Sequence, residues 1–425
     1  MSHRRLSLIF TGISFCAAAA AFGPSCGPSS QGGSLSGLMP DLKPAINDPN
    51  VDHDGDHQTV ASGDCNDYDP LTFKGAKEVC FDHKDQNCDG VPDEQCDDDK
   101  DGYAIVAADP LPGGDCDDGN PFVSPGAFEV VGNNADDNCD GKMDEVTPTC
   151  DVNLAPTAQD AMTFASSMDL CAPWLQSATW NRFIDVRGKK ITNHFGQVYK
   201  PQAGQTMAFF STGIAADRGD GGFTDPQPGY EFFQRDMNPL PITSKNICTN
   251  LKNGAPTESH DMIALTLKIK APSNATGFKF KLNFFSAEYP EYVGNQYNDM
   301  FIAYLQSKKF TGNISFDGNG EPVTVNSGFF QVCDSSPICA NGGHTCTKGP
   351  KDLDGTGYEI FAKNGERYGG GTGWLTTSKA VEPGEVFTLT LYVFDSGDYL
   401  FDSAVLLDGF EWLFDESIKE GTIPG

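Results

Sequence analysis

The sequence lacks the short motifs that mark common hydrolases and nucleotide-binding enzymes. It contains no Gly-x-Ser-x-Gly, no His-Glu-x-x-His, no phosphate-binding loop and no dinucleotide fingerprint. Histidine is scarce, and only His194, His260 and His344 follow residue 155. Carboxylate pairs for glycoside hydrolysis stay open, because their separation belongs to the fold and not to sequence spacing. The sequence therefore favours a protein that is not an enzyme.

Long apolar runs are missing after residue 22, so no later stretch is predicted to cross a bilayer. The run from Leu6 to Phe22 follows a basic cluster and predicts a secretory signal peptide over residues 1–26. Cys26 stands in a context similar to a lipoprotein cleavage site, so acylation at Cys26 and simple cleavage both remain open. Residues 27–47, rich in Gly, Ser and Pro, are predicted to be a flexible linker. The expected location is the outer membrane, the cell surface or the extracellular space.

Basic residues are few, and their shortage is concentrated in one segment. The formal net charge is −30, and residues 51–151 hold 27 Asp and Glu against 5 Lys. Such a field repels nucleic acid and anionic membrane surfaces. Divalent cations are therefore the expected partners, and membrane contact is expected only through a lipid anchor.

The acidic segment is an internal repeat with an offset of 51 residues. Asp64-Cys65-Asn66-Asp67 matches Asp115-Cys116-Asp117-Asp118, and Asn87-Cys88-Asp89-Gly90 matches Asn138-Cys139-Asp140-Gly141. We place the first copy at residues 48–96 and the second at residues 97–151.

Oxygen-bearing side chains stand at alternate positions ahead of a glycine four times in this segment. A hard cation needs six to eight oxygens, and alternate side chains on a tightly curled loop converge on one point while glycine permits the turn. The four loops are Asn50, Asp52, Asp54 and Gly55; Asp85, Asn87, Asp89 and Gly90; Asp97, Asp99, Asp101 and Gly102; and Asp136, Asn138, Asp140 and Gly141.

None of these loops has a glutamate at its twelfth position. Each is therefore expected to complete its ligand shell with nearby acids, for which the candidates are Asp64, Asp67, Asp69, Asp93, Glu94, Asp115, Asp117, Asp118, Asp144 and Glu145. The alternative is a solvated, disordered acidic linker. The fixed cysteine positions and the recurrence argue against that alternative.

Twelve cysteines remain besides Cys16 and Cys26, an even number that predicts disulfides in an exported chain. Equivalent positions in the repeat pair Cys65 with Cys88 and Cys116 with Cys139. Further expected pairs are Cys80 with Cys96, Cys150 with Cys171, and two among Cys248, Cys333, Cys339 and Cys346. The repeats have few large apolar residues, so metal and disulfides are expected to hold them together.

The two copies resemble the MopE-type metal-binding repeat, through their Asp-Cys-Asp-Asp-like and Asn-Cys-Asp-Gly blocks. That family takes its name from a copper-binding protein, so copper is the alternative to Ca²⁺. Oxygen ligands dominate here and favour Ca²⁺. His53 and His57 form either a secondary soft site or a solvated surface pair.

From about Ala155 onward, short apolar runs alternate with turn residues and predict strands. The runs are Met262–Ile269, Phe278–Phe285, Met300–Leu305, Phe387–Phe394 and Ala404–Leu413. The predicted fold is mainly β: acidic repeats stabilised by disulfides and metal, followed by a jelly-roll type β-sandwich over residues 155–418. Residues 158–175 are predicted to be helical.

Two blocks of the sandwich, residues 286–301 and 395–405, resemble the choice-of-anchor L domain of bacterial surface proteins. The resemblance implies a surface module and brings no activity with it. Four acids of these blocks lie where strands meet loops: Glu288, Asp299, Asp395 and Asp402. They form one more cation site, or they cap turns by accepting backbone hydrogen bonds.

The sequence thus predicts a calcium-binding structural or adhesive protein at the cell surface or secreted, in which calcium-rigidified repeats present a β-sandwich to a surface, matrix or glycan partner. A copper-binding surface protein is one alternative. The other is a carbohydrate-binding module or glycoside hydrolase accessory, for which Trp174, Trp180, Trp374 and Trp412 are the candidate sugar-stacking residues.

Overall fold

The computed structural model describes residues 48–80, 82–90, 96–105, 113–146, 149–181, 185–236, 243, 258–295, 297–334, 346–361, 367–415 and 417–425. The predicted signal peptide, the linker and Cys26 lie outside these residues, as do Asp93, Glu94, Cys248 and Cys339. No helix among the described residues has the length and apolar character of a membrane span.

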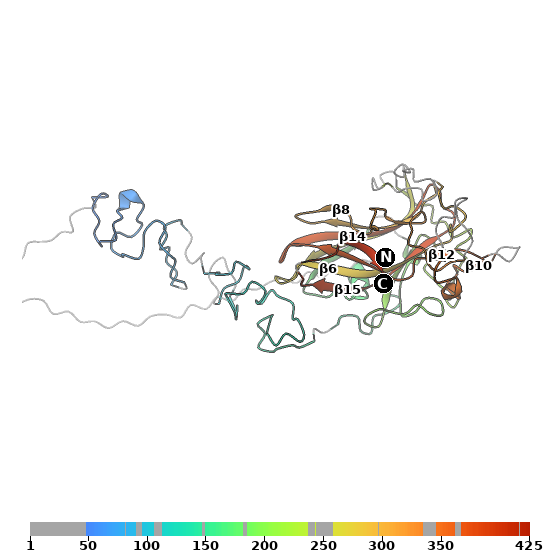
Figure 1. Ribbon diagram of the computed structural model, residues 1–425, viewed down its shortest axis with the longest axis horizontal. Coiled ribbons are helices and arrows are strands. Elements are labelled where there is room, and N and C mark those ends of the chain that lie inside the picture. Colours follow the sequence, from blue (N-terminus) through green and yellow to red (C-terminus); the bar gives the residue numbers. More distant parts are fainter. Residues whose placement is uncertain are drawn as a thin grey trace, which may run out of the picture. The chain divides into compact units, whose positions relative to one another are not determined.

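The protein is mainly β (Figure 1). The short helices are α1 (Ala161–Ser166) and the 3-10 helices η1 (Val60–Ser62), η2 (Val186–Gly188) and η3 (Lys351–Leu353). The strands are β1 (Leu175–Trp180), β2 (Lys189–Thr192), β3 (Met207–Ser211), β4 (Arg235–Asp236), β5 (Ser259–Lys270), β6 (Gly277–Ser286), β7 (Met300–Gln306), β8 (Thr311–Asn313), β9 (Val323–Thr324), β10 (Ile360–Phe361), β11 (Arg367–Tyr368), β12 (Gly370–Gly371), β13 (Leu375–Ala380), β14 (Val386–Ser396), β15 (Ser403–Leu413) and β16 (Gly421–Pro424).

Two antiparallel sheets of seven strands each form the sandwich. Sheet A has the order β1-β5-β14-β7-β8, with β4 paired to β5 and β9 to β7. Sheet B has the order β16-β13-β6-β15-β3-β2, with β12 paired to β6, while β10 and β11 form a separate ribbon. This architecture is the β-sandwich that the sequence predicts, and its last strand, β16, lies beyond residue 418.

The core lies between the sheets and follows the alternation in the sequence. Phe278, Phe280 and Leu282 of β6 are buried, whereas the lysines between them are half-buried. The ring of Phe278 stacks on Phe387 of β14 with the centroids 5.2 Å apart, which joins sheet B to sheet A. Each large apolar side chain buried in this way contributes about 1.5–3 kcal/mol to folding.

A second apolar cluster covers the other face of sheet B. It packs Phe209 of β3 and Phe285 of β6 against Phe195, Leu353 and Tyr358. Strand β3 is therefore buried on both faces, which explains why its apolar residues run without alternation.

The predicted helix over residues 158–175 is too long. Helix α1 begins after Asp160, whose carboxylate accepts the N–H of Thr163 at 2.9 Å. It ends before Asp169, whose φ of 65° is left-handed, and Cys171 forms a disulfide with Cys150. Strand β1 then starts at Leu175, because the chain joins sheet A beside β5.

In their described residues, the two repeats are built from turns and disulfides and not from sheets. The bridges Cys65–Cys88 and Cys116–Cys139 are the expected pairs, with Cα atoms 5.7 and 5.6 Å apart. Cys80–Cys96, Cys150–Cys171 and Cys333–Cys346 are the other bridges among the described residues. Each equivalent bridge closes the same separation of 23 residues, so the sequence repeat is also a structural repeat.

Candidate metal centre

Four loops share one hydrogen-bond pattern, in which the first carboxylate accepts the N–H of the residue five positions later. The four contacts are His57 to Asp52 at 3.0 Å, Gly90 to Asp85 at 2.8 Å, Gly102 to Asp97 at 2.9 Å and Gly141 to Asp136 at 2.9 Å. Each first carboxylate therefore curls its loop inward, as the spacing predicts. In the first loop the N–H of Gly55 also lowers the pKa of Asp52.

The pattern shifts the first loop by two residues from the alignment expected from sequence. Asp52 is equivalent to Asp97, so Asp56 takes the place of Asp101. Asn50 lies outside the loop, where it is exposed and donates to Asp48 at 3.0 Å. The misalignment arose because His57, with a left-handed φ of 77°, stands where the other loops have glycine.

Replacing His57 by glycine is therefore expected to stabilise the first repeat by about 1 kcal/mol, because a side chain in left-handed backbone costs about 1–2 kcal/mol and glycine avoids most of it. Calorimetric unfolding with Ca²⁺ present measures the change. The matched control is Gly102→His, which should destabilise the second repeat by a similar amount. No atom lies within 4 Å of a Cβ at this position, so the change adds backbone strain without a steric clash. If neither variant shifts its transition, backbone strain does not distinguish the loops.

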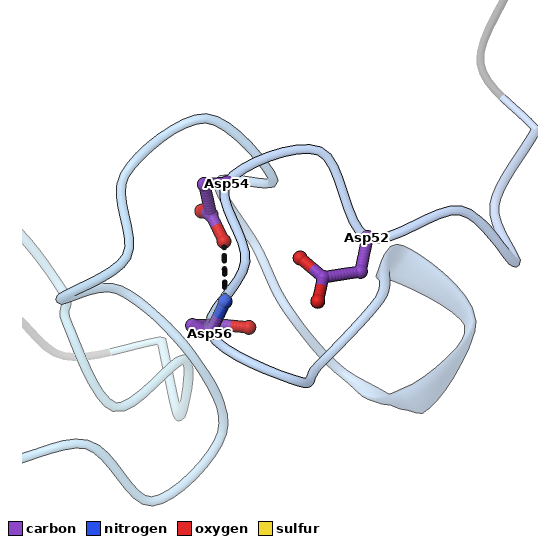
Figure 2. Close-up of side chains that lie close together, drawn as sticks. All are labelled: Asp52, Asp54 and Asp56. Carbon is purple, nitrogen blue, oxygen red and sulfur yellow. Dashed lines mark hydrogen bonds between the residues drawn. The ribbon is translucent and has the colours of Figure 1, made fainter.

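Carboxylates converge in three groups among the described residues, and all three lie in the repeats. Asp52, Asp54 and Asp56 form one group in the first copy (Figure 2), with ligand atoms within 4.8 Å of one another. The second copy has two groups that share Asp99: Asp97, Asp99 and Asp101, and Asp99, Asp115 and Asp118. In the second copy, the first loop and the Asp-Cys block that follows it thus come together around one centre.

Buried carboxylate oxygens without a partner occupy equivalent positions in both copies. They are the Oδ2 atoms of Asp54, Asp56 and Asp64 in the first copy and of Asp99, Asp101 and Asp115 in the second. Burial, together with repulsion from Asp101 and Asp115, raises the pKa of Asp99 to about 6. Burial likewise raises the pKa values of Asp54, Asp115 and Asp118. Oxygens of this kind suit a hard divalent cation, which would satisfy them and offset their repulsion.

The two copies differ beside the centre. In the first copy the backbone N–H of His53 donates to Asp67 Oδ1 at 3.4 Å, and the ring Nδ1 of His53 contacts Asp67 Oδ2. In the second copy Asp98 replaces this histidine, and its N–H donates to Asp118 Oδ1 at 3.3 Å. Asp118 is then available to the centre, so the second copy is expected to bind its cation more tightly.

The second loop of each copy has the same turn but no converging group of three carboxylates among the described residues. Lysines pair with two of the candidate acids instead: Lys142 Nζ lies 2.7 Å from Asp140 Oδ2, and Lys84 Nζ lies 3.6 Å from Asp69 Oδ2. Asp144 accepts the N–H groups of Gly132 and Asn134 and so closes a turn. The remaining candidates of these loops, Asp85, Asn87, Asp89, Asp136 and Asn138, take part in the same local turns, and Asp117 is exposed.

Sequence reasoning missed three acids. Asp56 was overlooked because the glycine after Asp54 appeared to close the first loop. Glu78 and Glu129 are buried and hold the second loops: Glu78 accepts the N–H of Asn87 at 2.8 Å, and Glu129 that of Asp144 at 2.8 Å. Glu78 and Glu129 stand 51 residues apart, which is the offset of the repeat, and this equivalence could have identified them from the sequence.

The four sandwich acids singled out in the sequence are all buried. Glu288 follows β6, Asp299 precedes β7, Asp395 lies in β14 and Asp402 precedes β15, so both sheets contribute. Asp299 and Asp402 accept backbone hydrogen bonds, as turn-capping acids do, but Asp395 does not.

Comparison with known families agrees with this geometry. Residues 205–411 match the choice-of-anchor L domain. Residues 64–94 and 115–145 each match the MopE-type copper-binding family, whose description is "Putative metal-binding motif". Two segments of the chain thus match this metal-binding motif, and the segment after them matches the choice-of-anchor L domain; both kinds of domain are typical of exported surface proteins. The carboxylates at residues 52–56 and 97–101 lie just before the matched ranges.

Three solved structures are weakly similar to the chain. The structure of TmCBM61 in complex with beta-1,4-galactotriose is 8% identical with a TM-score of 0.21, over 57% of this chain and 90% of that chain. The enzymatically active domain of bacteriophage CBA120 tailspike protein 4 is 9% identical with a TM-score of 0.17, over 57% of this chain and 20% of that chain. The K3 cleaved adhesin domain of Lys-gingipain from Porphyromonas gingivalis is 9% identical with a TM-score of 0.16, over 48% of this chain and 75% of that chain. Similarities this weak support no inference about ligand or activity. The chain has no match among curated proteins.

Proposed function

We propose that this chain is a surface or secreted protein whose repeats bind Ca²⁺ at one carboxylate centre each. The observation that carries this proposal is the set of unpartnered buried oxygens at equivalent positions of both copies. A solvated acidic linker would have no reason to bury the same three carboxylates twice. The chemistry at these centres is ion binding and calls for no catalytic residue.

The identity of the ion follows from the donor atoms. The converging groups consist of carboxylates, and the cysteines of the repeats are in disulfides. Ca²⁺ prefers such oxygen ligands, whereas copper prefers imidazole and sulfur. Among the described residues, His53 and His57 are the imidazoles near the first centre, and the ring of His53 already contacts Asp67.

Elemental analysis of protein purified without chelator, followed by titration calorimetry, tests the ion. We expect Ca²⁺ to bind with dissociation constants of about 10⁻⁴ to 10⁻³ M, as in extracellular modules. Cu²⁺ should bind only where His53 and His57 remain, so the double change to alanine serves as the control. Stoichiometric copper that survives loss of both histidines would make the copper alternative correct.

The proposed role of the ion-filled repeats is to present the sandwich to a partner as a stiff spacer. The second copy supports this role through direct contacts with the sandwich. Ser273 donates its N–H to Gly126 O at 2.8 Å, and Phe128 and Asn274 exchange two hydrogen bonds of 2.9 and 2.8 Å. Phe128 also packs on Trp174 and Phe414. The spacer therefore has a firm attachment at its sandwich end.

We propose a structural or adhesive module and not an enzyme or a sugar-binding one. Trp412 belongs to the buried core, Trp174 and Trp180 pack against that core, and Trp374 packs against the second cluster. Side chains used in this way have less ring surface to offer a sugar. A glycan array probed with the full chain tests the alternative, and selective binding that is lost on replacing Trp174 would favour a carbohydrate-binding module.

A further inference from the structure

A group of buried acids lies at one end of the sandwich without any basic partner. Glu288, Asp299 and Asp395 are each 1% exposed, Asp402 is 3% exposed, and Asp261 is 1% exposed. None of these five takes part in an ion pair between described residues. Burying so many carboxyl groups without counter-charge is costly, so something must neutralise them.

The strand register brings two of these acids together. In the antiparallel pair of β14 and β7, Phe394 stands opposite Met300, so Asp395 and Asp299 are the next residues of the chain beyond that pair, and the charge of Asp299 acts on Asp395. Residues opposite one another in such a pair have Cβ atoms about 4.5–5.5 Å apart on one face. The Ser396 N–H, which donates to Asp299 Oδ1 at 3.0 Å, fixes the Asp299 side chain at the end of β14.

Sheet B closes the group from the opposite side. Ser403, the first residue of β15, donates its hydroxyl to Asp299 Oδ2 at 2.7 Å. Asp402 accepts the N–H of Tyr230 at 3.1 Å through both oxygens. Groups of both sheets therefore hold the Asp299 side chain, and the backbone of Tyr230 holds that of Asp402.

Asp395 differs from its neighbours because neither of its buried oxygens makes a hydrogen bond of ordinary geometry to a described residue. Burial, and then the negative charge of Asp299, raises the pKa of Asp395 well above its ordinary value. The Asp395 carboxylate therefore has oxygens available to a cation. Asp299 also keeps lone pairs beyond the two hydrogen bonds that it accepts.

We propose that Asp395 and Asp299 bind a Ca²⁺ ion inside the sandwich, with Glu288 and Asp402 supplying additional negative charge around it. The carboxylates here are not drawn onto one point as in the repeats, so hydroxyl and backbone oxygens of the strand ends must complete the six to eight ligands that Ca²⁺ requires. The site shares no residue with the repeats, so this proposal can be tested independently of the function proposed for them.

Counting bound calcium in the full chain tests this site. Asp395→Asn should lower the bound Ca²⁺ by one per chain in equilibrium dialysis and should remove the calcium-dependent rise in the unfolding temperature of the sandwich. The matched control is Glu411→Gln, which removes the same charge from an exposed residue of β15 paired with Lys279 at 2.8 Å, and should change neither quantity. Both variants leave the repeats intact.

A proton is the rival to the cation. If Asp395 is simply protonated, asparagine mimics it: the calcium count stays the same and the stability stays equal or rises, which would overturn the proposal.

A second measurement needs no change to the acids and so does not depend on folding of Asp395→Asn. Tyr358 is buried and interacts electrostatically with Asp402, Asp395 and Asp299, so it should sensitise the luminescence of Tb³⁺ bound there. Tyr358→Phe is expected to remove one stoichiometric component of that emission, with Tyr103→Phe removing a different one near Asp101. Emission that does not change in Tyr358→Phe would also count against the site.

Discussion

Excess EDTA is expected to unfold residues 51–151 while the sandwich stays folded. Two carboxylates about 4 Å apart repel by about 4 kcal/mol at an effective dielectric near 20. The converging carboxylates of the repeats have ligand atoms within 4.8 Å of one another, so each group stores repulsion of this kind. Removal of the ion restores this repulsion in a segment with little apolar core, whereas the sandwich has a large core of its own. Differential scanning calorimetry should show loss of the repeat transition.

The control for this experiment is addition of Ca²⁺ beyond the chelator, which should restore the lost transition. The sandwich transition is expected to move to lower temperature in EDTA without disappearing, since its proposed ion adds to a core that already folds. A repeat transition that is the same with and without EDTA would show that disulfides alone hold the segment.

Changing Asp97, Asp99 and Asp101 together to asparagine should weaken calcium binding in the second copy by about 100-fold or more. The substitutions nearly preserve shape but remove charged ligands, and ligand charge sets affinity over several orders of magnitude. Small-angle scattering should also show a broader distance distribution, because the uncompensated charges around this loop swell the repeat. Titration calorimetry measures the binding.

The matched control is Asp136→Asn with Asp140→Asn in the second loop of the same copy, where the described carboxylates do not converge. This control should leave the tighter binding step almost unchanged. If the triple variant keeps both its binding and its dimensions, the loop is a solvated turn and the spacer model loses its support.

The strands of the sandwich could be predicted because their periodicity matches their burial. Alternating Phe and Lys in β6 mark one buried face, and the predicted runs all lie within β5, β6, β7, β14 and β15. The partners of these strands could not be predicted. β5 pairs with β14 across more than a hundred residues, and such pairing depends on the whole core and not on local sequence.

The repeat centres were predictable in their chemistry but not in their boundaries. Spacing identified the loops around Asp54 and Asp99, since alternation of oxygens is visible in the sequence. It could not distinguish a loop that starts at Asn50 from one that starts at Asp52, because both satisfy the alternation. The deciding feature is the left-handed backbone at His57, which spacing does not reveal.

In the sandwich, the sequence marked Asp299 and Asp395 as acids at strand ends, yet their pairing depends on the register of β7 and β14. That Asp395 lacks a partner is equally a property of the folded core. Composition and spacing therefore locate such residues but cannot tell a capping acid from an unsatisfied one.

The disulfides of the repeats have a consequence for how the protein matures. Cys88 and Cys139 each occupy a left-handed position of a second loop, with φ of 60° and 55°, and their partners stand next to Asp64 and Asp115. One covalent bond thus fixes a turn and, at the same time, positions an ion ligand in the neighbouring block. A reduced chain must search for this arrangement, whereas an oxidised chain presents it ready-made at lower entropic cost. If the repeats bind Ca²⁺ as proposed, the oxidised chain is therefore expected to bind the ion more tightly than the reduced chain, and titration of both forms measures the difference.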